Sequence, residues 1–250
     1  MELSLKNKVV LITGASRGIG KATALGLANA GADIAIVSRK LPDLEKAAEE
    51  IRKTGRKCLA VPAHAGKMEE INNLVQRVLD EFGKIDILVN NAATNPTMAS
   101  VLDVDERAWD AIMNLNLKGV FFLSQMVAKA MKEKGGGKII NVASIAGISP
   151  DILGVYSISK AAVIMATKVM AQQWAPYNIR VNAIAPGLTK TGFSEALWKN
   201  PDILKIAMSR TPLARPAEPE EMVAAVVYLA ADASSYVTGQ ILAIDGGYTI

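Results

Sequence analysis

Short apolar segments alternate with longer amphipathic segments along most of the chain. The first apolar run, Val9 to Ile12, precedes a predicted helix over residues 21–30 that Gly31 ends. Gly55 and Gly83 follow the next two amphipathic segments, at the position where a left-handed helix cap favours glycine. Continuously apolar strands that alternate with helices are typical of a parallel sheet with helices on both faces. The sequence therefore predicts an α/β fold built on a doubly wound sheet.

The alternation continues to the end of the chain and predicts seven strands without an internal linker, at residues 9–12, 33–38, 57–61, 85–90, 138–143, 179–185 and 240–244. The later helices are expected at residues 106–132, 155–174 and 219–231. A segment rich in proline, glycine and polar residues follows the sixth strand and contains short helical stretches. Because long loops in compact domains are usually functional, we interpret residues 187–218 as a lid on a single domain that spans residues 1–250.

The turn after the first strand carries three glycines, in Thr13-Gly14-Ala15-Ser16-Arg17-Gly18-Ile19-Gly20. Glycines between a buried strand and a helix let backbone approach a pyrophosphate, which the N–H groups at the helix start then bind. The spacing is Gly-x-x-x-Gly-x-Gly rather than the commoner Gly-x-Gly-x-x-Gly, and tight packing alone could also require these glycines. The turn is thus a candidate dinucleotide cradle in a Rossmann-type domain.

The residues after the second strand indicate which dinucleotide would bind. An NAD site of this kind has an acid about 20 residues beyond the glycine turn, which holds the ribose 2′-hydroxyl. Ser38 and Arg39 occupy that place, while Asp33 lies at the wrong end of the strand and Asp43 lies beyond it. A guanidinium fork suits a 2′-phosphate, and both Arg17 and Arg39 can reach one. Either arginine alone could be a surface charge, but the pair without the acid predicts NADP(H).

Composition excludes several other chemistries. Half of the 250 residues are apolar, which is enough for a sizeable core. Cys58 and His64 are the only cysteine and histidine, so a zinc site or a Ser-His-Asp triad would depend on His64, which has no ligand spacing. We predict no metal. The net charge is +4, and the lysines clustered over residues 129–138 are typical of a helix C-terminus rather than a nucleic-acid patch.

The sequence also shows no recognisable targeting signal. No apolar run approaches the roughly 20 residues of a membrane span, and residues 1–8 lack a signal peptide's apolar region and cleavage site. The last three residues, Tyr248-Thr249-Ile250, differ from a peroxisomal Ser-Lys-Leu signal. We therefore expect a cytoplasmic protein with neither a membrane nor a nucleic-acid partner.

Tyr156 and Lys160 stand four residues apart on a predicted helix, so their side chains share one face. Such pairs occur by chance, but this one lies a single loop beyond the strand that ends at Ser144, at the sheet edge where a nucleotide would bind. A nearby ammonium lowers the pKa of a phenol from about 10. Tyr156 could then exchange a proton with a carbonyl or alcohol oxygen while hydride moves at carbon, and Ser144 could hydrogen-bond that oxygen.

These motifs together resemble the short-chain dehydrogenase/reductase family over essentially the whole chain. Residues 13–20 are similar to its coenzyme turn, Asn90-Asn91-Ala92 to its sheet-stabilising segment, 156–160 to its active-site helix, and Pro186-Gly187 to its sixth-strand turn. The resemblance implies that Tyr156 is the catalytic acid/base, that Lys160 binds the nicotinamide ribose, and that Ser144 polarises the substrate. It also implies that Asn116, in the long helix, supports a water relay.

The resemblance adds two residues to the predicted cofactor site. It implies that Thr189 and Thr191 contact the nicotinamide amide and the phosphates. Three departures qualify it: Ala93 replaces a glycine, His64 takes the place of an adenine-contacting acid, and the interval from Ser144 to Tyr156 is one residue shorter than usual. The predicted cofactor contacts are Gly14, Ser16, Arg17, Gly18, Ile19, Gly20, Ser38, Arg39, His64, Ala65, Asn91, Ala92, Tyr156, Lys160, Pro186, Gly187, Thr189 and Thr191.

One branch of the family is especially similar, the NADP(H)-dependent carbonyl, dicarbonyl and retinal reductases. The residues that carry this resemblance are 38–40, 64–67 and 92–96. The expected enzyme reduces a ketone or aldehyde, or oxidises the matching alcohol. Alternatives are a 3-oxoacyl thioester reductase, a sugar alcohol dehydrogenase, or a non-catalytic NADP(H)-sensing protein. The long helices resemble the family's dimerising pair, which implies a homotetramer. Candidate substrate contacts, which could equally only pack the lid, are Thr94, Asn95, Ile152, Leu153, Phe193, Leu197 and Trp198.

Overall fold

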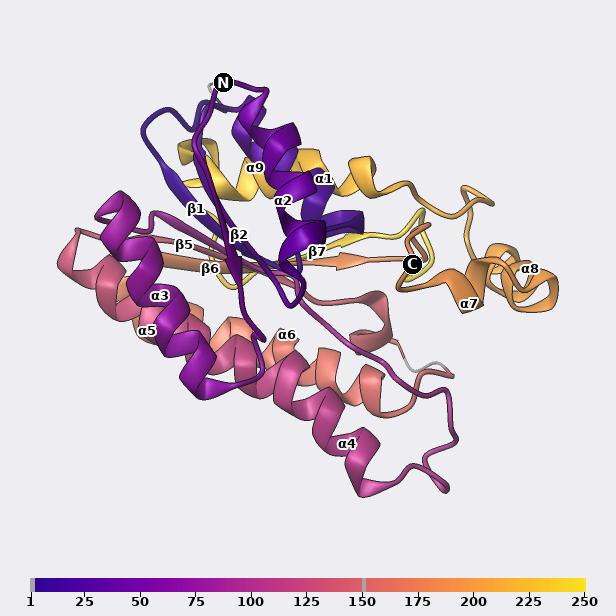
Figure 1. Ribbon diagram of the computed structural model, residues 1–250. Helices are drawn as coiled ribbons and strands as arrows, with labels where there is room; N and C mark the ends of the chain where they lie inside the picture. The colour runs from indigo at the N-terminus through magenta and orange to yellow at the C-terminus, as the bar shows by residue number, and fades with distance from the viewer. Residues whose placement is uncertain (1–2, 150–151) are drawn as a thin grey trace.

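The computed structural model describes residues 3–149 and 152–250, and its strands form a seven-stranded parallel sheet in the order β3-β2-β1-β4-β5-β6-β7. Figure 1 shows this sheet as the central layer of the molecule, with helices on both faces. The predicted fold class is thereby confirmed. The strands are β1 (Val9–Thr13), β2 (Asp33–Ser38), β3 (Cys58–Pro62), β4 (Ile87–Asn90), β5 (Gly137–Val142), β6 (Ile179–Pro186) and β7 (Ile241–Ile244).

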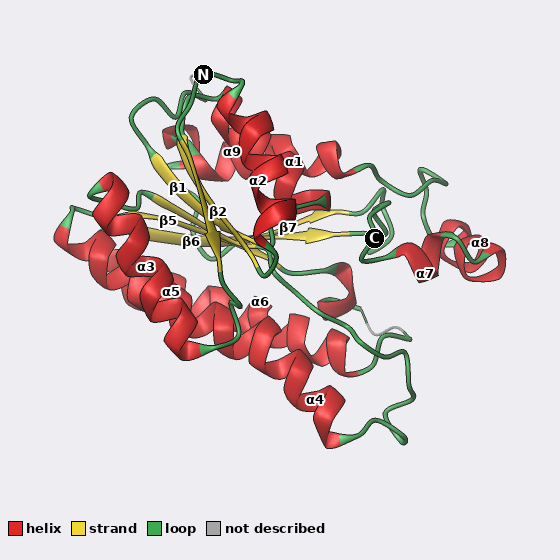
Figure 2. Cartoon of the chain, in the orientation of Figure 1, coloured by secondary structure: helices red, strands yellow, loops and turns green. Residues whose placement is uncertain are grey.

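The longer helices form two layers, one on each face of the sheet, and two short helices lie apart from both layers (Figure 2). One face of the sheet carries α1 (Gly18–Asn29), α2 (Leu41–Arg52) and α9 (Val223–Ala230). The opposite layer contains α3 (Met68–Phe82), α4 (Glu106–Met113), α5 (Val120–Glu133) and α6 (Val155–Trp174). The short helices α7 (Glu195–Trp198) and α8 (Pro201–Ser209) lie beyond the carboxyl end of β6, within the segment interpreted as a lid. The described residues also form the short 3₁₀ and π turns η1 (Asn114–Gly119), η2 (Ile145–Gly147), η3 (Ala175–Tyr177), η4 (Pro219–Met222) and η5 (Asp232–Ser234).

Each face of the sheet has its own apolar core, because successive side chains of a strand point to opposite faces. In β1, Val10 and Ile12 join the core beneath α1 and α9. Val9 and Leu11 join the core beneath α3, α5 and α6. All four side chains are buried, so β1 is apolar throughout rather than alternating.

The helix predicted over residues 106–132 forms, but η1 interrupts it with a π-helical turn. The π-helical turn packs closely against the turn before α3, because a Cβ on Gly119 would collide with the carbonyl oxygen of Ala65. By length and composition the stretch 106–133 could cross a membrane, with 44% of its most apolar window buried. In the fold, Leu123, Val127 and Met131 place its apolar side in the core.

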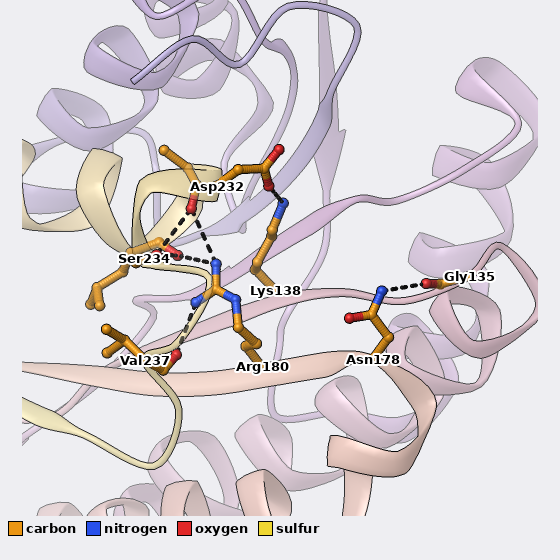
Figure 3. A network of polar contacts seen from close by, with 9 residues as sticks. Gly135, Lys138, Asn178, Arg180, Asp232, Ser234 and Val237 are labelled. Atoms are coloured by element: carbon orange, nitrogen blue, oxygen red, sulfur yellow. Dashed lines mark hydrogen bonds and ion pairs between the residues drawn. The ribbon is translucent and has the colours of Figure 1, made fainter. Parts of the chain in front are cut away.

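The amino ends of β5 and β6 are tied to the chain that follows α9 (Figure 3). Lys138 Nζ lies 2.7 Å from Asp232 Oδ1. The Arg180 guanidinium donates to three carbonyl oxygens, those of Leu229, Ala231 and Val237. The bonds to Leu229 and Ala231 satisfy carbonyl oxygens at the C-terminus of α9, where no further helical turn supplies N–H donors. The network fixes the end of the sheet opposite its carboxyl edge.

Candidate active site

A cavity of about 860 Å³ lies at the carboxyl ends of the strands, where open α/β sheets bind ligands. Its lining comes from the turns after β1, β2, β3, β4, β5 and β6, together with α6, the segment that contains α7 and α8, and the C-terminal turn. Every residue that the sequence predicts as a cofactor contact lines this cavity, from Gly14 to Thr191. The described part of the chain brings no three His, Cys, Asp or Glu side chains close enough to hold a metal ion.

The glycine turn is shaped both by packing and by the opening of a helix toward the cavity. Asn91 Nδ2 donates to the carbonyl oxygens of Thr13 and Gly14, each at 3.0 Å. A Cβ on Gly20 would collide with that same Asn91 amide, so tight packing does require this glycine. Gly18 has φ +57° and opens α1 without a side-chain cap, which leaves N–H groups of the first turn for a ligand. The turn therefore fits a pyrophosphate.

The side of the cavity next to β2 is basic. Arg17 and Arg39 both line it, and neither forms an ion pair with another described residue. The buried hydroxyl of Ser38, the residue before Arg39, has no hydrogen-bond partner among the described side chains and backbone groups. Asp33 pairs with Arg56 at 2.7 Å, at the opposite end of β2. Guanidinium groups are donors suited to a phosphate, and Asp43 and Glu50 of α2 also line the cavity.

The turn between β3 and α3 lies beside this basic region. The backbone N–H of His64 donates to Glu70 Oε2 at 2.6 Å, and His64 Nδ1 accepts from the N–H of Gly66 at 3.1 Å. A Cβ on Gly66 would lie 3.2 Å from the carbonyl oxygen of Asn114. The two hydrogen bonds hold the turn to α3 and to itself, and the close approach of Gly66 to Asn114 packs it against the π-helical turn η1.

Tyr156 and Lys160 project from α6 into the cavity and are buried, with exposed fractions of 7% and 3%. Lys160 Nζ donates to the carbonyl oxygen of Val142 at 2.6 Å and lies 5.6 Å from the centre of the Tyr156 ring. Burial lowers the pKa of Lys160 from 10.5 to about 8. The side chain is therefore still largely an ammonium at neutral pH, close to the phenol. Phe193, from the chain between β6 and α7, packs against Tyr156 with ring centres 5.8 Å apart.

Ser144 ends the loop after β5 and caps η2. Its Oγ accepts a hydrogen bond from the N–H of Ala146 at 3.1 Å, which leaves the hydroxyl proton for another acceptor. A Cβ on Gly147 would lie 2.5 Å from the carbonyl carbon of Lys160, so η2 packs directly on the backbone of α6. This contact brings Ser144 next to the helix that carries Tyr156 and Lys160. The sequence did not indicate that residue 147 must be glycine for this contact to form.

Asn116 is fully buried in η1 and does not line the cavity. Its Oδ1 accepts from the N–H of Thr94 at 2.8 Å, and its Nδ2 donates to the carbonyl oxygen of Thr94 at 3.0 Å and to Ser159 Oγ at 3.1 Å. Ser159 in turn donates to the carbonyl oxygen of Tyr156 at 2.7 Å. In this geometry Asn116 joins the chain after β4 to the active-site helix.

The candidate substrate residues divide into two groups. Ile152, Leu153, Phe193 and Leu197 line the cavity. Thr94, Asn95 and Trp198 are not part of its lining: the backbone of Thr94 is held by Asn116, the amide oxygen of Asn95 is buried, and the indole of Trp198 donates to the carbonyl oxygen of Thr191 at 3.0 Å. Further lining residues, which no sequence pattern indicated, lie near α8 and the C-terminus: Ile203, Ile206, Ala207, Arg210, Thr211, Asp245 and Tyr248.

A phenol, an ammonium and a serine hydroxyl thus face one cavity with a phosphate-binding turn, an arrangement suited to proton exchange beside a bound dinucleotide. Comparison with known proteins identifies the family. Residues 14–249 match the model of a family described as enoyl-(acyl carrier protein) reductase. Dehydrogenase/reductase SDR family member 4 of Oryctolagus cuniculus is 39% identical over 97% of this chain and 94% of its own length. The chain belongs to the short-chain dehydrogenase/reductase family.

Two further members of the short-chain dehydrogenase/reductase family support this assignment. The 2-dehydro-3-deoxy-D-gluconate 5-dehydrogenase of Dickeya dadantii (strain 3937) is 40% identical over 98% of this chain and 96% of its own length. The crystal structure of a putative NAD(P)-dependent gluconate 5-dehydrogenase from Beutenbergia cavernae, with NADP bound at low occupancy, is 35% identical, with a TM-score of 0.94 and 99% of each chain covered. The protein is therefore an oxidoreductase that uses a nicotinamide dinucleotide on a small molecule.

Proposed function

We propose that this protein is an NADP(H)-dependent oxidoreductase that interconverts a ketone or aldehyde and the matching alcohol, with Tyr156 as the general acid/base. One observation carries the proposal. Tyr156, Lys160 and Ser144 line the same cavity as the glycine turn, Arg17 and Arg39. When bound, the dinucleotide supplies or accepts hydride at the substrate carbon. The part of the chain from 187 to 218 is proposed to be the lid over this cavity.

The roles of the polar side chains follow from their surroundings. The Ser144 hydroxyl, oriented by the N–H of Ala146, donates to the carbonyl oxygen of the substrate and polarises it. Tyr156 gives its proton to that oxygen during reduction and takes it back during alcohol oxidation. The ammonium of Lys160 stabilises the phenolate that results. Asn116 positions Tyr156 through Ser159, and so acts without touching the substrate.

The choice of NADP(H) is part of the proposal and rests on three side chains. Arg17 and Arg39 line the cavity without an acidic partner among the described residues, and Ser38, whose buried hydroxyl has no partner among them, lines it too. An acid that could hold a ribose hydroxyl is missing from the end of β2, where Ser38 stands. These groups supply charge and donors for a 2′-phosphate.

Two related activities remain as second candidates because of the names of similar proteins. The matching family is described as enoyl-(acyl carrier protein) reductase, and two relatives are named for gluconate derivatives. A 3-oxoacyl thioester reductase or a sugar dehydrogenase would use the same three polar side chains on another substrate. A protein that only senses NADP(H) would bind the dinucleotide without turnover.

A substrate screen tests the proposal. Oxidation of NADPH and NADH is measured with ketones, diketones, aldehydes, oxoacyl thioesters and sugar acids, for the wild type and for Tyr156→Phe. Tyr156→Phe should lose turnover and keep its affinity for NADPH, because only the hydroxyl is removed. Binding of NADPH by the wild type with no turnover of any carbonyl compound would instead identify a sensor.

We also propose a cytoplasmic homotetramer. Several large apolar side chains of α4, α5 and α6 are exposed in the single chain: Trp109, Phe121, Ile158, Met165 and Val169. Packing between copies would remove this surface from water. Sedimentation measurements should give a mass of about four chains, and a monomer would refute this part of the proposal.

A further inference from the structure

Arg210 and Tyr248 form a pair in the cavity wall that the proposed chemistry does not use. Arg210 follows α8 in the lid, and Tyr248 lies two residues before the end of the chain. The guanidinium carbon of Arg210 lies 4.5 Å from the centre of the Tyr248 ring, and both residues line the cavity. A planar cation over a ring face has its N–H donors directed outward from the ring edge.

The pair is held in place by a tight junction between the lid and the C-terminal turn. The N–H of Leu213 donates to the carbonyl oxygen of Gly246 at 3.1 Å. A Cβ on Gly246, which has φ +64°, would lie 2.9 Å from the methyl group of Thr211. Thr211 Oγ1 donates back to the carbonyl oxygen of Ala207 in α8 at 2.9 Å. The backbone on both sides of the pair is thus fixed by contacts that do not involve a ligand.

Asp245, three residues before Tyr248, also lines the cavity, but its carboxylate is already hydrogen-bonded within the C-terminal turn. Asp245 Oδ1 accepts from the N–H of Gly247 at 3.0 Å, and Oδ2 accepts from the N–H and hydroxyl of Thr249 at 3.0 and 2.7 Å. Burial alone would raise the pKa of Asp245, but these hydrogen bonds hold it below its usual value. Both carboxylate oxygens are therefore committed to the turn that carries Tyr248.

Three other cations of the lid are paired with carboxylates, and Lys205, which has no ion pair with a described residue, lies outside the cavity lining. Lys190 pairs with Glu218, Lys199 with Glu195, and Arg215 with Glu221. Among the described residues, Arg210 has no carboxylate within ion-pair distance. The lining beside it on α8 is apolar, with Ile203, Ile206 and Ala207. The cavity therefore combines an apolar wall with an unpaired guanidinium, a combination that suits a chain of carbon atoms ending in an anion.

We propose that Arg210, held over Tyr248, binds a carboxylate of the substrate, so that this enzyme acts on oxo acids or the matching hydroxy acids. The inference rests on the proposed function, because it names the substrate class of the same site. The carbonyl group lies at Ser144 and Tyr156, and the carboxylate lies at the lid. Arg210 is then the residue that determines specificity.

The test compares acids with their neutral esters. The probes are 4-oxopentanoate, 5-oxohexanoate, 6-oxoheptanoate and the methyl ester of each, with kcat and KM measured separately. The wild type should prefer at least one acid to its ester by about tenfold or more in kcat/KM, chiefly through KM, because the guanidinium binds charge away from the reacting carbon. Arg210→Met should remove that preference and leave the esters within about twofold. Arg215→Met, which removes a lid arginine outside the cavity lining, should behave as the wild type.

Binding experiments separate failure of this inference from failure of the proposed function. Calorimetric titration of hexanoate and hexanamide into the NADP⁺-loaded enzyme reports carboxylate binding without turnover. Tighter binding of hexanoate that Arg210→Met abolishes would support the inference even if none of the oxo compounds were reduced. Equal binding of the two ligands, or equal kcat/KM for acids and esters, would overturn it and leave the reductase proposal standing. A loss of NADPH affinity in Arg210→Met would also overturn it, because Arg210 would then bind the dinucleotide.

Discussion

Asn116 Nδ2 donates a 3.1 Å hydrogen bond to Ser159 Oγ, and this bond joins a π-helical turn to the helix that carries Tyr156 and Lys160. The same amide also holds the backbone of Thr94 through two hydrogen bonds. Asn116 is therefore at the junction of three segments that are distant in sequence. Its proposed part in catalysis acts through position rather than through contact with the substrate.

Replacement of Asn116 by alanine should loosen this junction. We expect the free energy of unfolding to fall by about 1–3 kcal/mol, because buried hydrogen-bonding groups of Thr94 and Ser159 lose their partner. The kcat should fall by about tenfold while the affinity for NADPH stays within about twofold, since Asn116 does not line the cavity. Chemical denaturation, kinetics and NADPH titration measure the three effects. Asn114→Ala, at an exposed position of the same turn, is the matched control, and an equal loss in both variants would contradict the assignment.

The buried Lys160 predicts a pH dependence of stability. Its pKa is lowered by burial from 10.5 to about 8, so between these values the unfolded chain binds a proton that the folded chain does not. Stability should therefore rise with pH across this window, by up to about 3 kcal/mol relative to a variant that cannot titrate there. Urea unfolding of the wild type and of Lys160→Met, at pH 7.5 to 10.5, measures the difference. Parallel curves for the two proteins would show that the lysine has an ordinary pKa.

The two arginines at the basic end of the cavity predict coenzyme selectivity. Arg17→Met and Arg39→Met should each raise the Kd for NADPH by about tenfold or more, because a charge-assisted contact to the 2′-phosphate is lost. The Kd for NADH should change by less than about twofold. Fluorescence titration of both coenzymes measures this split, and Arg77→Met, at an exposed position of α3 outside the cavity lining, is the control. A wild-type preference for NADH would refute the roles of both arginines.

Gly147 predicts a steric requirement close to the reacting groups. In Gly147→Ala the new methyl group would lie 2.5 Å from the carbonyl carbon of Lys160, so η2 must move away from α6 and carry Ser144 with it. We expect kcat to fall by about 100-fold, since catalysis depends on placement within about 1 Å. Gly55→Ala serves as a control: it strains a residue at φ +80° with open space around it, and should cost about 1 kcal/mol of stability without loss of activity. Activity of Gly147→Ala near the wild-type level would show that Ser144 needs no such support.

Local signals predicted much of the fold and part of the candidate site. The apolar run of β1 and the glycine that ends α3 indicate their structures without help from distant residues, and Gly83 does adopt the left-handed cap, at φ +73°. Boundaries were less accurate, since α1 begins at Gly18 rather than at Lys21 and β4 begins at Ile87 rather than at Ile85. Helix and strand ends depend on capping and pairing partners, which the segment itself does not contain.

By itself the sequence determined the parallel sheet, the glycine turn and the shared face of Tyr156 and Lys160, because periodicity and short spacing along one element specify them. Only the tertiary structure decided that Asn116 lies behind the cavity, that Trp198 turns to the backbone of Thr191, and that Arg210 lies over Tyr248. Such relationships join residues across turns or between distant segments. They are set by close packing in three dimensions, which no local pattern of residues encodes.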